Sequence, residues 1–189
     1  MSFIYLVSII FISAFFTGIS HQPIGFGWLA WFSLIPIIFI INKINSIKEF
    51  ILFGYLWGLV YYVTIIFWLA SNNGTTQFIG IISLIIAVCF CSLNFILIFL
   101  FSRLIKKLFT NKWYFLFPFV WVVVEYIRNQ DILSGGAWTS LANTQLDYLI
   151  LAQNVEFTGI YGISFWIVLI NVLLYNWLLN PFSKNILFY

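Results

Sequence analysis

Long apolar runs dominate this chain, and short polar breaks separate them. A helix needs about 20 mostly apolar residues to cross a bilayer, and six stretches approach that length. They are roughly Phe3–Ile19, Gly25–Ile41, Phe50–Ala70, Phe78–Ser102, Trp113–Ile127 and Gly159–Leu179. The pattern predicts an all-α integral membrane protein, a bundle of about six transmembrane helices. We expect one polytopic membrane domain over residues 1–189 and no soluble domain.

Composition supports the membrane class. Hydrophobic residues make up 63% of the chain and charged residues only 7%, against roughly 25% charged residues in soluble domains. A soluble chain of this length leaves too much surface in contact with water to hide so many apolar side chains. The net charge of +3 comes from sparse cations in short breaks, so it does not indicate a nucleic-acid partner.

The basic residues predict an orientation. Lys43 and Lys48 follow the second apolar run, a basic stretch at 103–112 follows the fourth, and Lys184 follows the sixth. With six spans, all of these lie on one side of the membrane. Lys and Arg are enriched in cytoplasmic loops, so both termini are expected in the cytoplasm and the loop from Arg128 to Glu156 outside. The run Phe3–Ile19 has no preceding Lys or Arg, which favours a retained helix over a signal peptide.

Two cysteines, Cys89 and Cys91, lie inside the fourth apolar run. Their spacing places them on different faces of a helix, and no basic neighbour stabilises a thiolate. We expect apolar packing, with no metal or cofactor site and no nucleophile. Gly54 and Gly58 form a G-x-x-x-G pair that allows close helix packing.

Glu125 and Arg128 stand out in an otherwise apolar segment. Their i, i+3 spacing places them on one helical face, and ionisable groups near a membrane are costly unless they are paired or useful. The simplest interpretation is a structural ion pair that anchors a helix end at the interface, where such a pair contributes under about 1 kcal/mol.

The segment Gly135-Gly136-Ala137-Trp138 is the second candidate feature. Adjacent glycines favour a tight or re-entrant turn, which would present Trp138 at the interface. An aromatic-belt residue is the alternative, because aromatics are 22% of the chain. His21 is the single histidine and is interpreted as a plain loop residue. Asn94 and Asn171, within predicted helices, are each expected to make an interhelical hydrogen bond.

Several short motifs occur in one order along the chain. They are Trp28-Leu29-Ala30 with Ser33-Leu34 and Pro36; Gly54 to Gly58 leading to Trp68; Trp121, Glu125 and Arg128; Gly135-Gly136-Ala137-Trp138; Thr144-Gln145; and Gly159-Ile160-Tyr161-Gly162-Ile163-Ser164-Phe165. Together they resemble the membrane part of the apolipoprotein N-acyltransferase family. The family has proline where this chain has Ala137 and serine where it has Thr144.

The resemblance implies a role in lipoprotein biosynthesis. Such transferases move an acyl chain from a phospholipid donor to the amino-terminal cysteine of a diacylglyceryl lipoprotein acceptor. A nitrilase-like domain performs the acyltransferase chemistry with a Glu-Lys-Cys set, in which an activated thiolate forms a thioester. In this chain the resemblance implies substrate binding by Trp138, Gly135, Gly136 and Gln145, and localisation in the bacterial cytoplasmic (inner) membrane.

The resemblance does not cover the nitrilase-like domain, which the family places after a seventh helix. We therefore expect no catalytic residue in this chain, inactivity on its own, and a fragment or a split enzyme whose partner is a separate nitrilase-like chain. The alternative is a non-catalytic membrane protein or a truncated remnant. A small transporter fits less well, because the ionisable residues lie in loops or at a helix end rather than at mid-membrane.

Overall fold

The computed structural model describes residues 2–71, 73–130 and 136–179, and that part of the chain contains helices and no strands. The helices are α1 (Phe3–Ile19), η1 (Gly27–Trp31), α2 (Ile35–Lys43), α3 (Ile47–Ile66), η2 (Phe67–Ser71), α4 (Gln77–Cys91), α5 (Leu93–Phe109), η3 (Thr110–Leu116), α6 (Phe117–Gln130), η5 (Gly136–Thr139), η6 (Leu141–Gln145), α7 (Leu149–Ala152) and α8 (Val155–Leu179). Large apolar side chains such as Ile4, Phe78 and Leu108 face outward. An all-α membrane bundle is therefore confirmed.

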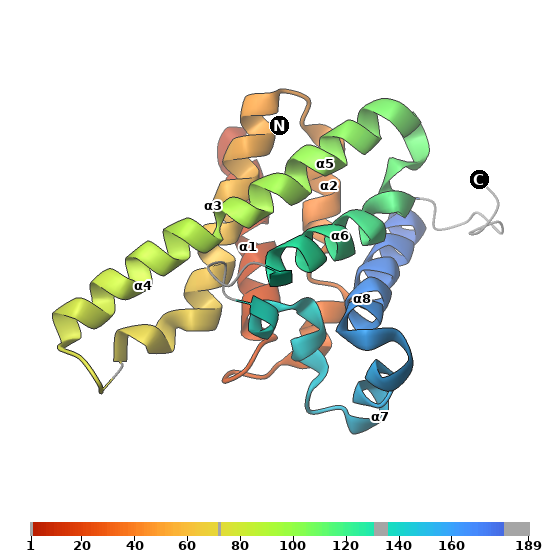
Figure 1. Ribbon diagram of the computed structural model, residues 1–189. Helices are drawn as coiled ribbons and strands as arrows, with labels where there is room; N and C mark the ends of the chain where they lie inside the picture. Colours follow the sequence, from red (N-terminus) through yellow and green to blue (C-terminus); the bar gives the residue numbers. More distant parts are fainter. Residues whose placement is uncertain (1, 72, 131–135, 180–189) are drawn as a thin grey trace.

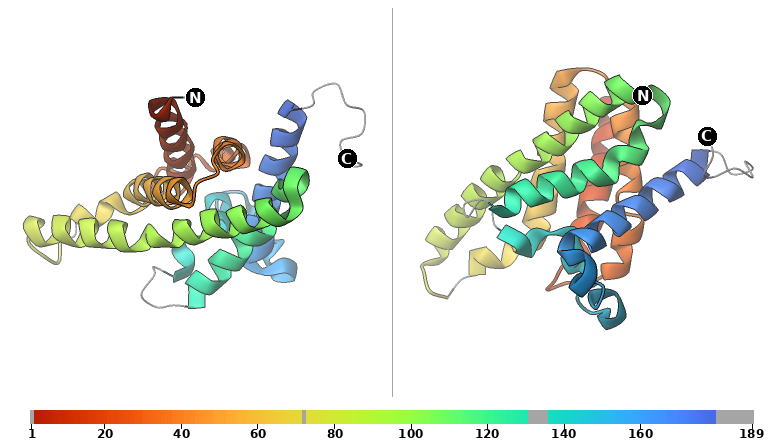
Figure 2. Two further views of the ribbon diagram at one scale, coloured as in Figure 1. Left: turned by 90° about the horizontal axis from the view of Figure 1, so that it is seen from above. Right: turned by 45° about the vertical axis from the view of Figure 1, so that its right-hand side comes forward.

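In the described part of the chain, three helical segments are long and apolar enough to cross a membrane. They are Ile47–Ser71, Gln77–Phe109 and Val155–Leu179. The segments Phe3–Ile19 and Gly27–Lys43 are apolar but shorter. The predicted fourth helix, residues 78–102, is the larger, N-terminal part of a longer rod made of α4 and α5. Figure 1 shows this rod crossing the molecule diagonally, and Figure 2 shows its α4 end extending beyond the other helices.

Glycines of α3 allow this rod to lie close to the bundle. A Cβ added to Gly58 would lie 2.8 Å from the carbonyl oxygen of Ser92, the residue between α4 and α5. A Cβ added to Gly54 would lie 3.0 Å from the carbonyl oxygen of Phe95. The predicted close packing at the G-x-x-x-G pair is confirmed, and its partner is the start of α5.

The predicted second helix, residues 25–41, is interrupted between η1 and α2. Asn171 of α8 supplies hydrogen-bond partners for the backbone at this interruption. Its side-chain amide donates to the carbonyl of Ala30 at 2.8 Å and accepts from the backbone N–H of Leu34 at 2.9 Å. Non-helical backbone at membrane depth must find such partners inside the protein. The interhelical hydrogen bond expected of Asn171 is confirmed, whereas Asn94 makes no side-chain hydrogen bond within the described residues.

An aromatic cluster joins three helices at the centre of the bundle. Trp57 and Tyr61 of α3 stack with ring centroids 4.9 Å apart, and Trp57 lies 4.4 Å from Phe95 of α5. Trp121 of α6 meets Trp57 edge-on at 5.9 Å. Each such pair contributes roughly 0.5–1.5 kcal/mol beyond simple burial. The cluster also fixes α6, and with it the positions of Glu125 and Arg128.

One end of the bundle carries most of the basic residues. The predicted basic loop at 103–112 is helical as far as Phe109, the last residue of α5. Lys106 donates to the carbonyl of Ile41 at 3.0 Å and to that of Asn42 at 2.8 Å, so it caps the C-terminus of α2. The Asn42 side chain donates to the Tyr175 hydroxyl near the end of α8. In Figure 1 the first turn of α1 lies at this same end, which we call the basic end.

The segment between α6 and α8 folds over the opposite end, called the loop end. Helix α6 continues to Gln130, beyond the predicted end at Ile127, and η5, η6 and α7 follow. Leu141 and Ala142 of η6 are buried, so the segment packs into the bundle rather than extending from it. Helix α8 is kinked at Gly159, whose positive φ of 66° is readily adopted only by glycine.

Candidate functional site

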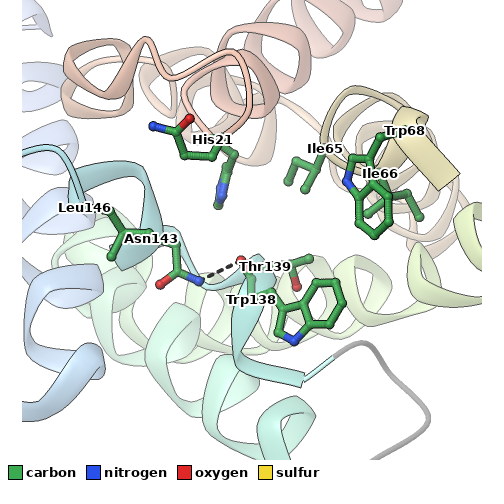
Figure 3. Close-up of a pocket in the computed structure, with 9 residues that line it drawn as sticks. His21, Ile65, Ile66, Trp68, Trp138, Thr139, Asn143 and Leu146 are labelled. Atoms are coloured by element: carbon green, nitrogen blue, oxygen red, sulfur yellow. Dashed lines mark hydrogen bonds between the residues drawn. The ribbon is translucent and has the colours of Figure 1, made fainter. Parts of the chain in front are cut away.

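A pocket of about 270 Å³ lies at the loop end, and we call it the loop-end pocket. It is bounded by the turn after α1, by the junction of α3 and η2, and by η5 and η6. Its lining residues are His21, Gln22, Ile65, Ile66, Trp68, Trp138, Thr139, Asn143 and Leu146. Figure 3 shows the imidazole of His21 pointing into this space from one side, with the two indoles on the other.

The apolar wall of the pocket is formed mainly by two tryptophans. The indoles of Trp68 and Trp138 are nearly parallel, with an interplanar angle of 17° and centroids 6.2 Å apart. Trp138 is 68% exposed, so most of its indole is accessible. Ile65 and Ile66 continue the wall along α3. An exposed indole over an apolar cavity suits a ligand that has an acyl chain and a polar head.

Asn143 holds the backbone that presents Trp138. Its side-chain amide donates to the carbonyl of Ala137 at 2.7 Å and to that of Trp138 at 2.6 Å. The second of these hydrogen bonds is drawn in Figure 3. Two hydrogen bonds from one side chain fix the path of η5, so the direction of the Trp138 indole depends on Asn143.

The polar side of the pocket is organised by Tyr61. Its hydroxyl lies 2.9 Å from Nε2 of His21 and donates to the carbonyl of Thr139, also at 2.9 Å. Because a carbonyl only accepts and a phenol has a single proton, Nε2 of His21 must be the donor to Tyr61. The Thr139 hydroxyl is buried and has no hydrogen-bond partner within the described residues. It is one of the polar atoms in this wall that can accept or donate a further hydrogen bond.

His21 is therefore a neutral hydrogen-bonding group. Burial is the main cause, and the nearby positive charge of Arg128 adds to it: together they lower the pKa of His21 from 6.5 to about 3. The imidazole carries no charge at neutral pH. It positions Tyr61 and borders the pocket without attracting an anion.

Glu125 and Arg128 lie directly behind the pocket wall, buried to 3% and 5% exposure. The Glu125 carboxylate accepts from the backbone N–H of Leu141 at 2.7 Å and from the indole N–H of Trp121 at 3.0 Å. Arg128 donates to the hydroxyl of Tyr62 at 3.3 Å and interacts electrostatically with Glu125. The two charges join α6 to α3 and to η6. They are deeply buried, in contrast to the interfacial pair expected from the sequence.

The remaining predicted site residues lie in different surroundings. Gly136 begins η5, next to the pocket, and Gly135 lies outside the described residues. Gln145 is buried away from the pocket lining, where it donates to the carbonyl of Gly27 at 2.9 Å and accepts from the Trp31 indole at 3.1 Å. These contacts support a structural role, and substrate binding by Gln145 stays a prediction.

Sequence reasoning missed His21 and Asn143 as parts of this site. A single histidine two residues before Pro23 offers no local partner in the sequence, and its contact with Tyr61 joins residues 40 positions apart. Asn143 lies only five residues after Trp138, so their proximity in the sequence was the available signal.

The lining of the site consists of two indoles, aliphatic side chains and neutral polar groups. No cluster of three or more possible metal ligands occurs in the described part of the chain. Cys89 is exposed and Cys91 is buried, and both lie on α4, outside the lining of the loop-end pocket. The arrangement can hold an amphipathic molecule against two indoles, next to a neutral polar wall.

Comparisons with known proteins identify the family. A family profile described as the apolipoprotein N-acyltransferase N-terminal domain matches residues 13–173. Similar proteins include the apolipoprotein N-acyltransferases of Geobacter metallireducens, 29% identical over 91% of this chain and 33% of the relative, and of Rickettsia typhi, 29% identical over 94% of this chain and 35% of the relative. The enzyme of Chlorobaculum tepidum is 25% identical over 77% of this chain and 26% of the relative. The chain thus spans about a third of the length of these curated relatives, and it belongs to the apolipoprotein N-acyltransferase family as its N-terminal membrane portion.

Proposed function

We propose that this chain forms the membrane portion of an enzyme that transfers an acyl chain from a phospholipid to the N-terminal cysteine of diacylglyceryl lipoproteins. The family and the extent of the match support this function. The chain supplies the site where the lipids gather, and a nitrilase-like part carrying the Glu-Lys-Cys set supplies the chemistry. Without that part the chain is inactive.

The loop-end pocket is the observation that carries the proposal. Trp138 is held by Asn143 and stacked on Trp68, so one face of its indole is available over an apolar cavity. Acyl methylene groups there gain van der Waals contacts with the indoles and with the isoleucines of α3. The indole N–H can meet a headgroup or ester carbonyl while the ring contacts the chain. We assign substrate binding to Trp138 and, as the sequence predicts, to Gly135 and Gly136.

The location proposed is the bacterial cytoplasmic (inner) membrane, with both termini in the cytoplasm. The grouping of Lys106 and Lys107 with the first turn of α1 at the basic end supports it, because Lys and Arg favour the cytoplasmic side. The loop-end pocket then opens on the outer face. Reporter fusions after Leu179 and within η6 test this arrangement, and it requires a cytoplasmic signal for the first and an external signal for the second.

Complementation tests the function. A chimera that joins this chain to a nitrilase-like domain of the family is expressed in a strain depleted of its own acyltransferase. Growth and N-acylation of a reporter lipoprotein are expected from the chimera, and neither is expected from the chain alone. Failure of a well-expressed chimera would favour the alternative, a non-catalytic membrane protein or a truncated remnant.

Two tryptophan variants of the chimera test the site. Trp138→Ala is expected to lower N-acylation while membrane insertion is unchanged. Trp166→Ala is the matched control, because Trp166 is also exposed but lies on α8 outside the pocket. If Trp138→Ala acylates as well as the Trp166→Ala control, Trp138 is an aromatic-belt residue and the site assignment is wrong.

A further inference from the structure

A second cavity lies at the basic end, and we call it the basic pocket. It has a volume of about 250 Å³ and lies between the α2–α3 connection and the last turns of α5. Its lining residues are Ile44, Asn45, Phe50, Arg103, Lys106 and Lys107. It is far from the loop-end pocket in the fold, because the two cavities occupy opposite ends of the bundle.

Three cations of α5 converge on this cavity. Arg103, Lys106 and Lys107 have i, i+3 and i, i+4 spacings, so they share one side of the helix, where like charges repel. Lys106 is already engaged, since its ammonium donates to the carbonyl of Ile44 at 2.7 Å as well as to the last carbonyls of α2. Within the described residues, neither Arg103 nor Lys107 donates a side-chain hydrogen bond.

The nearby acid Glu49 attracts Lys106, but it can offset only one of these positive charges. One oxygen of the Glu49 carboxylate accepts from the backbone N–H groups of Asn45 and Ser46, at 3.3 and 3.0 Å. Through these contacts Glu49 caps the N-terminus of α3, where a negative charge is favoured. Lys43 and Lys48 add further positive charge close by in the chain. The basic pocket therefore keeps a positive field that attracts an anion.

The surroundings of the pocket favour a lipid. Its inner wall is apolar, formed by Ile44 and Phe50, which are almost completely buried. On α5, Leu104, Leu108 and Phe109 expose more than half of their surface beside the cations. If the anion bound by Arg103 and Lys107 is a lipid headgroup, its acyl chains would lie along these exposed apolar side chains. A free ion would use the cations alone and leave the apolar surface unused.

We propose that the basic pocket binds the phosphodiester headgroup of an anionic phospholipid. The guanidinium of Arg103 matches two phosphate oxygens at once, and Lys107 supplies a second positive charge. Basic pockets between transmembrane helices on the cytoplasmic side bind anionic headgroups in this way. This site is separate from the loop-end pocket proposed for acyl transfer, because it lies at the other end of the bundle. The lipid bound there would join the α2–α3 connection to α5.

Native mass spectrometry of the purified 189-residue chain in detergent tests the proposal. The chain is titrated with phosphatidylglycerol, with zwitterionic phosphatidylcholine, and with inorganic phosphate as a competitor. Phosphatidylglycerol is expected to bind at least tenfold more tightly than phosphatidylcholine. Removing both cations, in Arg103→Gln/Lys107→Gln, is expected to weaken phosphatidylglycerol binding by about thirtyfold or more, because each loses a direct charge-assisted hydrogen bond to the phosphate that a cation outside the pocket does not make.

Lys43→Gln/Lys48→Gln is the matched control, because it removes the same charge at the same end from residues outside the pocket lining. It should retain most of the preference for phosphatidylglycerol. Equal binding of the two lipids by the parent chain overturns the proposal, and so does an equal loss in both double variants, which would indicate diffuse surface charge. Displacement of phosphatidylglycerol by phosphate, but not by chloride of equal ionic strength, would assign the site to the free ion. If the first double variant does not fold, Lys107→Gln alone must reduce the preference.

Discussion

Glu125 offers the sharpest test of how this bundle is held together. Its carboxylate accepts two hydrogen bonds, from the backbone of Leu141 and from the indole of Trp121, and it faces the charge of Arg128. All of this lies within the bundle, where Glu125 is 3% exposed. Glu125→Ala therefore removes the acceptor of two buried donors and the charge that faces a buried guanidinium.

The expected magnitude follows from that geometry. Breaking a buried charge pair by removing one partner costs about 3–5 kcal/mol, whereas an exposed pair would contribute about 0–1 kcal/mol. Glu125→Gln separates the two contributions, because it keeps an oxygen acceptor and removes only the charge. Hydrogen bonds to charged groups exceed neutral ones by about 1 kcal/mol each. Two such bonds predict a loss of about 2 kcal/mol for Glu125→Gln from these contacts alone, and losing the charge that faces Arg128 adds to it.

The assay is equilibrium unfolding of the purified chain in mixed micelles, followed by tryptophan fluorescence. Trp57 and Trp121, two of the nine tryptophans, are buried beside the site and contribute to the signal. Glu156→Ala is the control, because it removes an exposed carboxylate near the same end and should shift the unfolding free energy by less than about 0.5 kcal/mol. A loss below about 1 kcal/mol for Glu125→Ala would show that the pair behaves as a surface pair, and the buried network described here would be refuted.

Three further predictions concern packing, the pocket and pH. Gly58→Val should destabilise the bundle by about 1–3 kcal/mol, because its Cβ would meet the carbonyl oxygen of Ser92 at 2.8 Å; a melting temperature equal to that of the parent chain would contradict this contact. In the chimera, Asn143→Ala should lower N-acylation toward the level of Trp138→Ala without changing membrane insertion, since it releases the backbone that presents the indole; normal acylation would show that Asn143 is dispensable. The unfolding free energy should fall as the pH drops from about 6.5 toward 3, because over that range the unfolded chain protonates His21 and the folded chain does not. His21→Asn should flatten that part of the plot of unfolding free energy against pH. An unchanged slope in this variant would refute the assignment of the pH dependence to His21.

The membrane class and the family followed from the sequence, because each depends on local pattern or on motif order. Apolar runs of this length require lipid whatever their packing. The glycine spacing of Gly54 and Gly58 predicted close packing, although the partner, the start of α5, became known only from the fold. Helix ends were less well predicted, because α5 continues through Arg103, Lys106 and Lys107. Their long side chains place the charges at the basic pocket and at the C-terminus of α2 while the backbone stays helical.

The sequence by itself determined that the chain is an apolar helical bundle with few charges, and it singled out Glu125, Arg128 and Trp138 as its unusual residues. Only the tertiary structure decided what those residues contact. Hydrophobic period and length are properties of neighbouring residues, whereas the loop-end pocket joins His21, Tyr61 and Thr139, which lie far apart in the chain. Burial is likewise a property of the whole fold: the spacing of Glu125 and Arg128 is the same for a surface pair and for a buried one. Here η6 and α3 close over both residues, and that enclosure makes the pair a strong constraint on the bundle.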